Sequence, residues 1–101
     1  ALDTSVTGPA RVLAIAAGPN PFEGRTIVRY TLPAAGAATV AVYSPDGRLV
    51  RRLAEGRRDA GTYAVEWNGR TSGGRPAPAG AYVVAVRAAG AERSVRVLLS
   101  R

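Results

Sequence analysis

The side chains that could carry out acid–base chemistry in this sequence are its carboxylates, and each stands singly in a predicted turn or strand. They are Asp3, Glu23, Asp46, Glu55, Asp59, Glu66 and Glu92. Histidine and cysteine are absent, so the sequence lacks the usual general base, the imidazole metal ligand and the thiolate nucleophile. A calcium loop would also need several oxygen ligands at short spacing. We therefore expect no catalysis, no metal site and no cofactor in this domain.

The positive charge of the chain is carried entirely by arginine. The formal net charge is +7, and none of the 14 basic residues is lysine. Together with the abundant alanine, glycine and proline, this bias indicates a GC-rich genome rather than selection for a basic surface. A guanidinium group can bind phosphate or carboxylate, but the arginines are scattered over every predicted strand, and no aromatic residues alternate with them to stack bases. We therefore expect no nucleic-acid partner.

The length and composition indicate one folded domain. A chain of 101 residues, of which 47% are apolar, can bury a core. None of its apolar runs approaches the roughly 20 residues that cross a bilayer. The chain begins at Ala1 without an initiator methionine or an apolar signal core, and we interpret it as a piece of a larger protein. Residues 1–9 are small and polar, which predicts a linker from an upstream domain, and residues 10–101 should form the domain itself.

The elements that must position any functional side chain are strands, and the clearest of them lie between Ala38 and Leu53 (ATVAVYSPDGRLVRRL). Two β-prone runs flank the turn sequence SPDG. Pro45 has the φ that the second turn position requires, Asp46 can bond to its own backbone, and Gly47 tolerates a positive φ. The pattern predicts a β-hairpin.

Five further segments alternate apolar and polar side chains, as half-buried strands do. These segments are residues 10–16, 26–32, 62–67, 81–87 and 94–99. The loop 18–24 contains Pro19 and Pro21, which exclude helix and ladder pairing, so it should either cross between sheets or turn a corner. Residues 55–61 and 68–80 should be connections.

The alternation also predicts which side chains form the core. The inward positions are Val28, Tyr30, Val40, Val42, Val65, Trp67, Tyr82, Val84, Val97 and Leu99. Phe22 should either close one end of this core or stay outside with Tyr43. We expect Trp67 to anchor the core, in place of the disulfide that joins the sheets of antibody domains. Seven short antiparallel strands with turns between them predict an all-β, immunoglobulin-like β-sandwich without helices, and a small barrel is the alternative.

Six sequence blocks carry a resemblance to a known family. The blocks are NPF at residues 20–22, TIVRYTLP at 26–33, VAVYSPDGRLVRRL at 40–53, AGTYAVEWNGR at 60–70, PAGAY at 78–82 and RVLLSR at 96–101. In this order and at these spacings they resemble the C-terminal sorting domain of proteins exported by the type IX secretion system. That family is similar in turn to the immunoglobulin-like domain of the flagellar hook-capping protein.

The resemblance implies a non-catalytic domain at the C-terminus of a large secreted protein, often a hydrolase, which the outer-membrane export machinery recognises. It implies passage through the periplasm and attachment to the cell surface, and we expect the domain to be a monomer. Gly80 and Tyr82 match the family's Gly-x-Tyr motif, and Gly90 matches the turn glycine that follows it. Arg96 stands where the terminal motif, which ends here at Arg101, usually has lysine. The substitution keeps the positive charge but changes its shape.

Alternative roles are open for these residues and for the domain. Gly80 and Gly90 could serve turns only, Tyr82 could fill the core, and Arg96 could lie on a solvated strand face. A carbohydrate-binding module would use exposed aromatic rings, with Trp67 as its nominee, although the alternation places this ring inward. An architectural immunoglobulin-like spacer of a secreted glycoside hydrolase is the other alternative. The position of the domain in the parent chain discriminates between a spacer and a sorting domain, because a spacer can lie anywhere and a sorting domain must end that chain.

Overall fold

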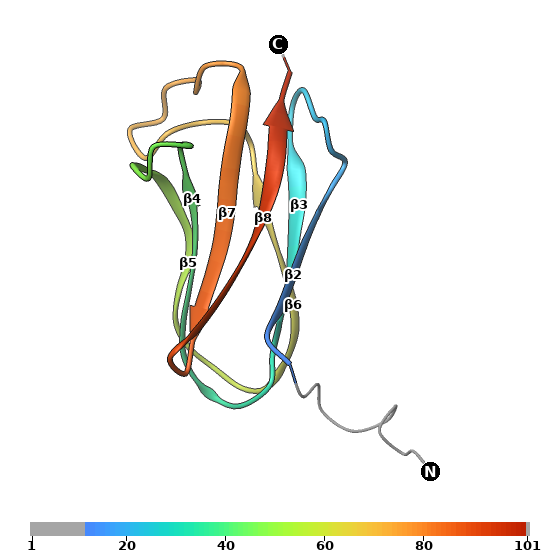
Figure 1. The fold of residues 1–101 in the computed structure, drawn as a ribbon, viewed down its shortest axis with the longest axis vertical. Coiled ribbons are helices and arrows are strands. Elements are labelled where there is room, and N and C mark those ends of the chain that lie inside the picture. Colours follow the sequence, from blue (N-terminus) through green and yellow to red (C-terminus); the bar gives the residue numbers. More distant parts are fainter. Residues whose placement is uncertain (1–11, 101) are drawn as a thin grey trace.

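The chain folds into two β-sheets that face each other across a core (Figure 1). The computed structural model describes residues 12–100. Within this range it contains no helix and these strands: β2 (Ala14–Gly18), β3 (Thr26–Leu32), β4 (Gly36–Tyr43), β5 (Leu49–Arg58), β6 (Gly61–Trp67), β7 (Gly80–Ala88) and β8 (Ala91–Leu99). The predicted linker over residues 1–9 lies outside the described range.

One sheet has the strand order β2-β3-β6 and the other the order β5-β4-β7-β8, and all neighbouring strands are antiparallel. The prediction of an all-β, immunoglobulin-like sandwich of seven strands is therefore confirmed, with two separate sheets in place of a closed barrel. Between residues 12 and 100 there is no helix long and apolar enough to span a membrane.

The core is built by the strand residues that alternate toward the space between the sheets. Apolar residues without exposed surface are Val28, Val40, Val42, Trp67, Val84, Val86 and Val97. Burying each valine contributes about 1.5–3 kcal/mol to folding, so the central strands β3, β4 and β7 supply much of the stability. At the edge of the core, the ring of Tyr30 stacks on that of Tyr63 with 5.6 Å between centroids.

The loop between β2 and β3 turns a corner within one sheet. Ala14 pairs with Thr31, so the two strands are direct neighbours and the loop does not cross to the other sheet. The peptide bonds before Pro19 and Pro21 are both cis. Of the two placements predicted for Phe22, the buried one is correct, because its side chain is only 2% exposed.

The predicted β-hairpin is formed by β4, β5 and the turn between them. The Gly47 amide donates to the Ser44 carbonyl over 2.9 Å, and Gly47 has a φ of 90°. The Ser44 hydroxyl donates to the Asp46 carboxylate. This hydrogen bond, with smaller contributions from Arg48, lowers the pKa of Asp46 below its ordinary value. The turn chemistry read from the sequence is the chemistry that closes the hairpin.

The second strand of this hairpin is longer than predicted. Residues 55–58, expected to belong to a connection, continue β5 and pair with β4, with Gly56 opposite Ala38 and Arg58 opposite Gly36. β5 is an edge strand, where charged side chains can reach water without breaking the ladder. The polar composition of residues 55–58 therefore reflects an exposed edge strand and not a turn.

The first strand was also misplaced. Residues 10 and 11 of the predicted strand 10–16 lie outside the described range; from residue 12 on, the strand is Ala14–Gly18, the segment that pairs with Thr31 to Ile27 of β3. Val12, expected within that strand, precedes it and is 61% exposed. These bounds depend on the neighbouring strand, and the alternation of side chains within one segment gives no information about that neighbour.

The turn between β7 and β8 contains a strained residue. Ala88 pairs with Ala91, which leaves a two-residue loop of Ala89 and Gly90 with φ values of 53° and 76°. A positive φ at both positions defines a type I′ turn, which favours Asn-Gly. Alanine in this region costs about 1–2 kcal/mol. Gly90 suits its position, whereas Ala89 does not.

We predict that Ala89→Asn raises the free energy of unfolding by about 1 kcal/mol, because asparagine tolerates the left-handed region better than alanine. Urea denaturation measures the change. The matched control is Ala34→Asn, an exposed position without a positive φ, which should change stability by less than about 0.5 kcal/mol. Equal effects of the two substitutions would show that Ala89 is not strained in solution.

Candidate functional site

Three of the residues that the resemblance singles out lie close together on the β7–β8 hairpin. Gly80 pairs with Leu99, and Tyr82 pairs with Val97. Arg96 precedes Val97 and points to the opposite, solvent side of the sheet, because Val97 is buried and Arg96 exposed. The hairpin thus presents Tyr82 to the core and Arg96 to the surface at one end of the domain.

Tyr82 belongs to an aromatic cluster around Trp67. The Trp67 ring packs at 5.4 Å from the ring of Phe22 and edge-on at 5.1 Å from that of Tyr82. Its Nε1–H donates to the Arg70 carbonyl over 3.0 Å. The Tyr82 hydroxyl donates to the Pro78 carbonyl. Both polar tips therefore tie the long loop between β6 and β7 to the core, which explains why these two rings are buried without unpaired donors.

Asn20 fastens the last strand to the loop between β2 and β3. Its Nδ2 donates to the Arg96 carbonyl and its Oδ1 accepts from the Leu98 amide, both over 2.9 Å. The backbone of Phe22 continues this pattern, donating to Leu98 over 2.9 Å and accepting from the Ser100 amide over 2.8 Å. We call these four bonds the Asn20 latch.

The Asn20 latch covers part of an exposed sheet edge. β8 is an edge strand, whose outward amides and carbonyls would otherwise lack partners. An asparagine carboxamide has the donor and acceptor of a peptide group, so it can stand in for a neighbouring strand. Sequence reasoning assigned no role to Asn20. The only signal was that the NPF block precedes the RVLLSR block in a fixed order.

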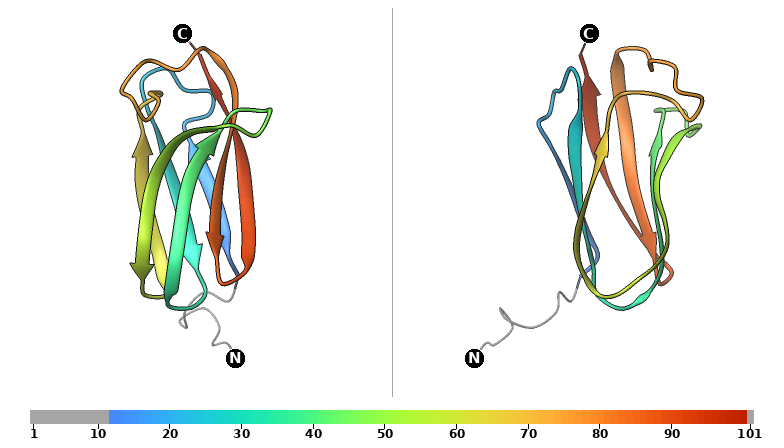
Figure 2. Two further views of the ribbon diagram at one scale, coloured as in Figure 1. Left: turned by 90° about the vertical axis from the view of Figure 1, so that its left-hand side faces the viewer. Right: turned by 180° about the vertical axis from the view of Figure 1, so that it is seen from behind.

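The loops and strand ends described above form one end of the sandwich, which we call the motif end. It comprises the loop 19–25, the loop 68–79, the start of β7 and the end of β8. Figure 1 shows them together near the C-terminus, and both views of Figure 2 agree. Four of the six sequence blocks meet at the motif end.

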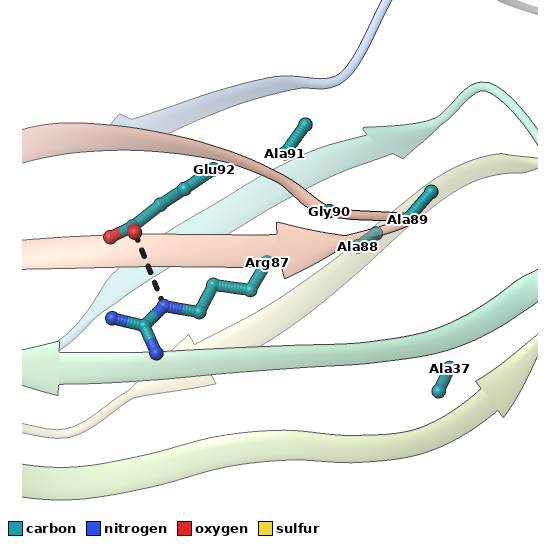
Figure 3. A pocket seen from close by; sticks show the side chains of 7 residues that line it. All are labelled: Ala37, Arg87, Ala88, Ala89, Gly90, Ala91 and Glu92. Carbon is teal, nitrogen blue, oxygen red and sulfur yellow. Dashed lines mark hydrogen bonds and ion pairs between the residues drawn. The ribbon is translucent and has the colours of Figure 1, made fainter.

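Gly90 lies at the other end of the β7–β8 hairpin, in the turn already described. Beside this turn is an open hollow of about 400 Å³, shown in Figure 3. It is lined by alanine methyl groups and by an ion pair in which Arg87 Nε lies 3.2 Å from Glu92 Oε1. In Figure 3 the two polar side chains of the lining, Arg87 and Glu92, are directed at each other. Arg101, the last residue of the predicted motif, lies outside the described range.

Within residues 12–100 no three histidine, cysteine, aspartate or glutamate side chains lie close enough together to hold a metal ion. The carboxylates of Glu66, Asp46, Glu55 and Glu92 instead form surface ion pairs, with Arg25, Arg48, Arg52 and Arg87. The motif end is instead held together by aromatic packing and by hydrogen bonds of the Asn20, Trp67 and Tyr82 side chains to the backbone.

Comparison with known proteins identifies the family. Residues 18–92, well over half of the chain, match the model of the FlgD Ig-like domain. The chain belongs to this family. None of the curated proteins matches the sequence.

Two solved structures share the fold of this FlgD Ig-like domain. FlgD from P. aeruginosa has a TM-score of 0.58 and 22% sequence identity, over 92% of this chain and 75% of that one. The second is PorZ, an essential bacterial surface component of the type-IX secretion system of Porphyromonas gingivalis. It has a TM-score of 0.56 and 24% identity, over 86% of this chain. The domain corresponds to only 11% of the PorZ chain.

The aromatic rings of this FlgD Ig-like domain do not form a sugar platform. Trp67, Phe22, Tyr30 and Tyr82 are all buried, and Tyr43 and Tyr63 are half-buried. Tyr63 is moreover covered by the guanidinium of Arg58, 5.4 Å from its ring centroid. A carbohydrate module that binds through exposed rings therefore has no basis among the described residues.

Proposed function

We propose that this domain is a C-terminal sorting and cell-surface attachment domain of a larger secreted protein. Its partners are the type IX export machinery at the outer membrane and an upstream domain of the same chain, such as a hydrolase. The cargo passes through the periplasm, and the domain itself, a monomer, catalyses nothing. The residues assigned to recognition are Gly80, Tyr82, Gly90, Arg96 and Arg101.

The observation that carries the proposal is the convergence of separate sequence blocks at the motif end. Asn20 and Arg96 are 76 positions apart and are joined by a hydrogen bond. Trp67 links a third block to Phe22, and Tyr82 links a fourth to Trp67. A folded signal needs such convergence, because its receptor contacts one surface rather than a stretch of chain.

The similarity to PorZ adds support at the level of the fold. PorZ is a surface component of a type IX system, and one of its segments has this architecture. The likeness to FlgD shows that the same architecture occurs outside that system. Since a fold can serve several functions, the proposal depends on the sequence blocks and their convergence.

A reporter fusion tests the proposal. A signal peptide and a fluorescent protein are placed before residues 1–101 and expressed in a bacterium with type IX secretion. We predict that the fluorescent protein reaches the cell surface, where added protease removes it. In a strain without the export system it should remain protected in the periplasm.

The matched control is the Ig-like domain of P. aeruginosa FlgD in the same fusion, which has the fold at only 22% sequence identity. It should stay in the periplasm. Retention of our domain in the periplasm, or equal delivery of both domains, would refute sorting and leave the architectural spacer as the function. Far-UV circular dichroism of both purified fusions confirms that each domain is folded.

A further inference from the structure

The outer face of the four-stranded sheet carries a row of side chains that runs across all its strands. Leu49 of β5 pairs with Tyr43 of β4, Tyr43 with Val83 of β7, and Val83 with Arg96 of β8. Successive partners in a sheet share one face, so three apolar side chains and one guanidinium lie side by side. Leu98, two residues beyond Arg96, extends the row toward the motif end.

This row, which we call the apolar row, has an exposed leucine at each end and the half-buried Tyr43 and Val83 between them. Leu49 is 47% and Leu98 44% exposed, and Val12 is the one other large apolar side chain among residues 12–100 with comparable exposure. Single exposed leucines need no explanation, but an aligned group with an aromatic ring and an arginine has the composition of interface cores. Tyrosine and arginine are also the residues most often found to dominate binding energy.

Next to the row is a groove of about 280 Å³. It is lined by Tyr43 and the β4–β5 turn, by Val83 and Ala85 of β7, by Ser94 of β8 and by the Arg87–Glu92 ion pair. The left view of Figure 2 shows that turn reaching from β4 toward β7. An apolar side chain of a partner could enter beside Ala85 and Ser94, which are small, with the Arg87–Glu92 ion pair next to it.

The charges on this face favour an acidic partner. Arg52 lies 3.8 Å from Glu55, and Arg87 lies 3.2 Å from Glu92, so two of its arginines are paired within the domain. The guanidinium of Arg96 makes no ion pair or hydrogen bond with any residue between 12 and 100. A partner carboxylate beside apolar side chains would complement this guanidinium and its neighbours Val83 and Leu98.

The outer face of the three-stranded sheet also carries a hollow, of about 210 Å³, but its strands present no exposed large apolar side chain. Ala16, Arg29 and Ala64 pair across its strands, and its large apolar residue Ile27 is half-buried. Arg29 is exposed there without an apolar row. The two faces therefore offer arginines of the same charge in different surroundings.

We infer that the apolar row and its groove are the surface on which the export machinery docks, through a protein segment that presents a carboxylate beside apolar side chains. This inference rests on the proposed sorting function and specifies its partner chemistry. Four strands spaced about 4.8 Å apart give the row a width of only about 14 Å. Contacts of this size are weak and transient. Such binding suits a domain that the export machinery must release after transport.

The reporter fusion tests this surface through paired variants. On the apolar row, Arg96→Glu and Leu49→Ser should each lower surface fluorescence by about tenfold or more, as loss of a dominant contact does. The controls Arg29→Glu and Val12→Ser make the same changes elsewhere and should leave it within about twofold. Arg96→Lys keeps the charge and should retain most of the delivery. Unchanged urea midpoints in all five variants show that the fold is intact.

The outcomes separate the two proposals. Retention of the unmodified fusion in the periplasm would overturn both. If the unmodified fusion is delivered and the variants of the apolar row are delivered normally too, only the docking surface is overturned. The same holds if the control variants lose as much surface fluorescence as the variants of the apolar row. Sedimentation of the purified domain should show a monomer. A dimer that Arg96→Glu dissociates would assign the surface to a second copy of the domain and overturn the inference.

Discussion

A Trp67→Ala variant is expected to lose about 3–5 kcal/mol of unfolding free energy, the usual cost of removing a buried tryptophan side chain. The indole is completely buried and contacts two other rings, Phe22 and Tyr82. Its removal also leaves the Arg70 carbonyl without its donor. Domains of this size are stable by about 5–15 kcal/mol, so the substitution removes between about a fifth and all of the domain's stability.

Urea denaturation followed by far-UV circular dichroism measures this loss, since Trp67 is the only tryptophan and its fluorescence disappears with it. Leu49→Ala is the control, because Leu49 is 47% exposed and its truncation should cost less than about 0.5 kcal/mol. A Trp67→Ala midpoint equal to that of the parent would show the ring to be exposed in solution. A sugar platform would then become tenable again.

The fold could be predicted from the sequence where two local signals agreed. In β3, the alternation of Val28 and Tyr30 with Ile27 and Arg29 gave both the bounds and the inward face correctly. In the β4–β5 hairpin, Pro45 and its neighbours specified the turn. Such segments are predictable because the period of the side chains and the chemistry of the turn act over only a few residues.

The predictions from the sequence were wrong or incomplete where the structure depends on pairing with residues outside the segment itself. β5 extends through its charged end because β4 offers a partner for it. The Asn20 latch depends on a strand 76 positions away. The apolar row is likewise produced by register across four strands, and the alternation in any one strand shows only that Tyr43, Val83 and Arg96 face outward. Strand pairing is the information that local patterns lack.

The candidate site was accordingly recognised in part. Gly90 and Tyr82 could be nominated from the resemblance, and the structure places the first in a tight turn and the second in the aromatic cluster. These positions give each residue a structural role, so their substitution alone cannot separate folding from recognition. Arg96 differs because its side chain is exposed, and it is therefore the residue through which recognition can be tested with the fold intact.

The last strand should be required for the fold as a whole. A chain that ends after Gly90 loses β8, with the buried Val97 and Leu99 and the half-buried Val95. At about 1.5–3 kcal/mol for each side chain, the loss is about 5–9 kcal/mol, comparable with the entire stability of such a domain. We predict that residues 1–90 show no cooperative urea transition by circular dichroism. A retained transition would contradict the assignment of β8 to the core.

A synthetic peptide of residues 91–101 should restore the transition, because the β7 ladder and the Asn20 latch remain available to bind it. Asn20→Ala in the truncated chain removes two hydrogen bonds to the strand, each contributing about 1 kcal/mol. The peptide should then bind roughly thirtyfold more weakly. Asn68→Ala is the matched control and should leave the affinity unchanged, since within residues 12–100 the Asn68 side chain accepts only a local hydrogen bond, from the Arg70 amide. Equal affinities of the two variants in a fluorescence titration of labelled peptide would show that the latch does not hold the closing strand, and that β7 alone does.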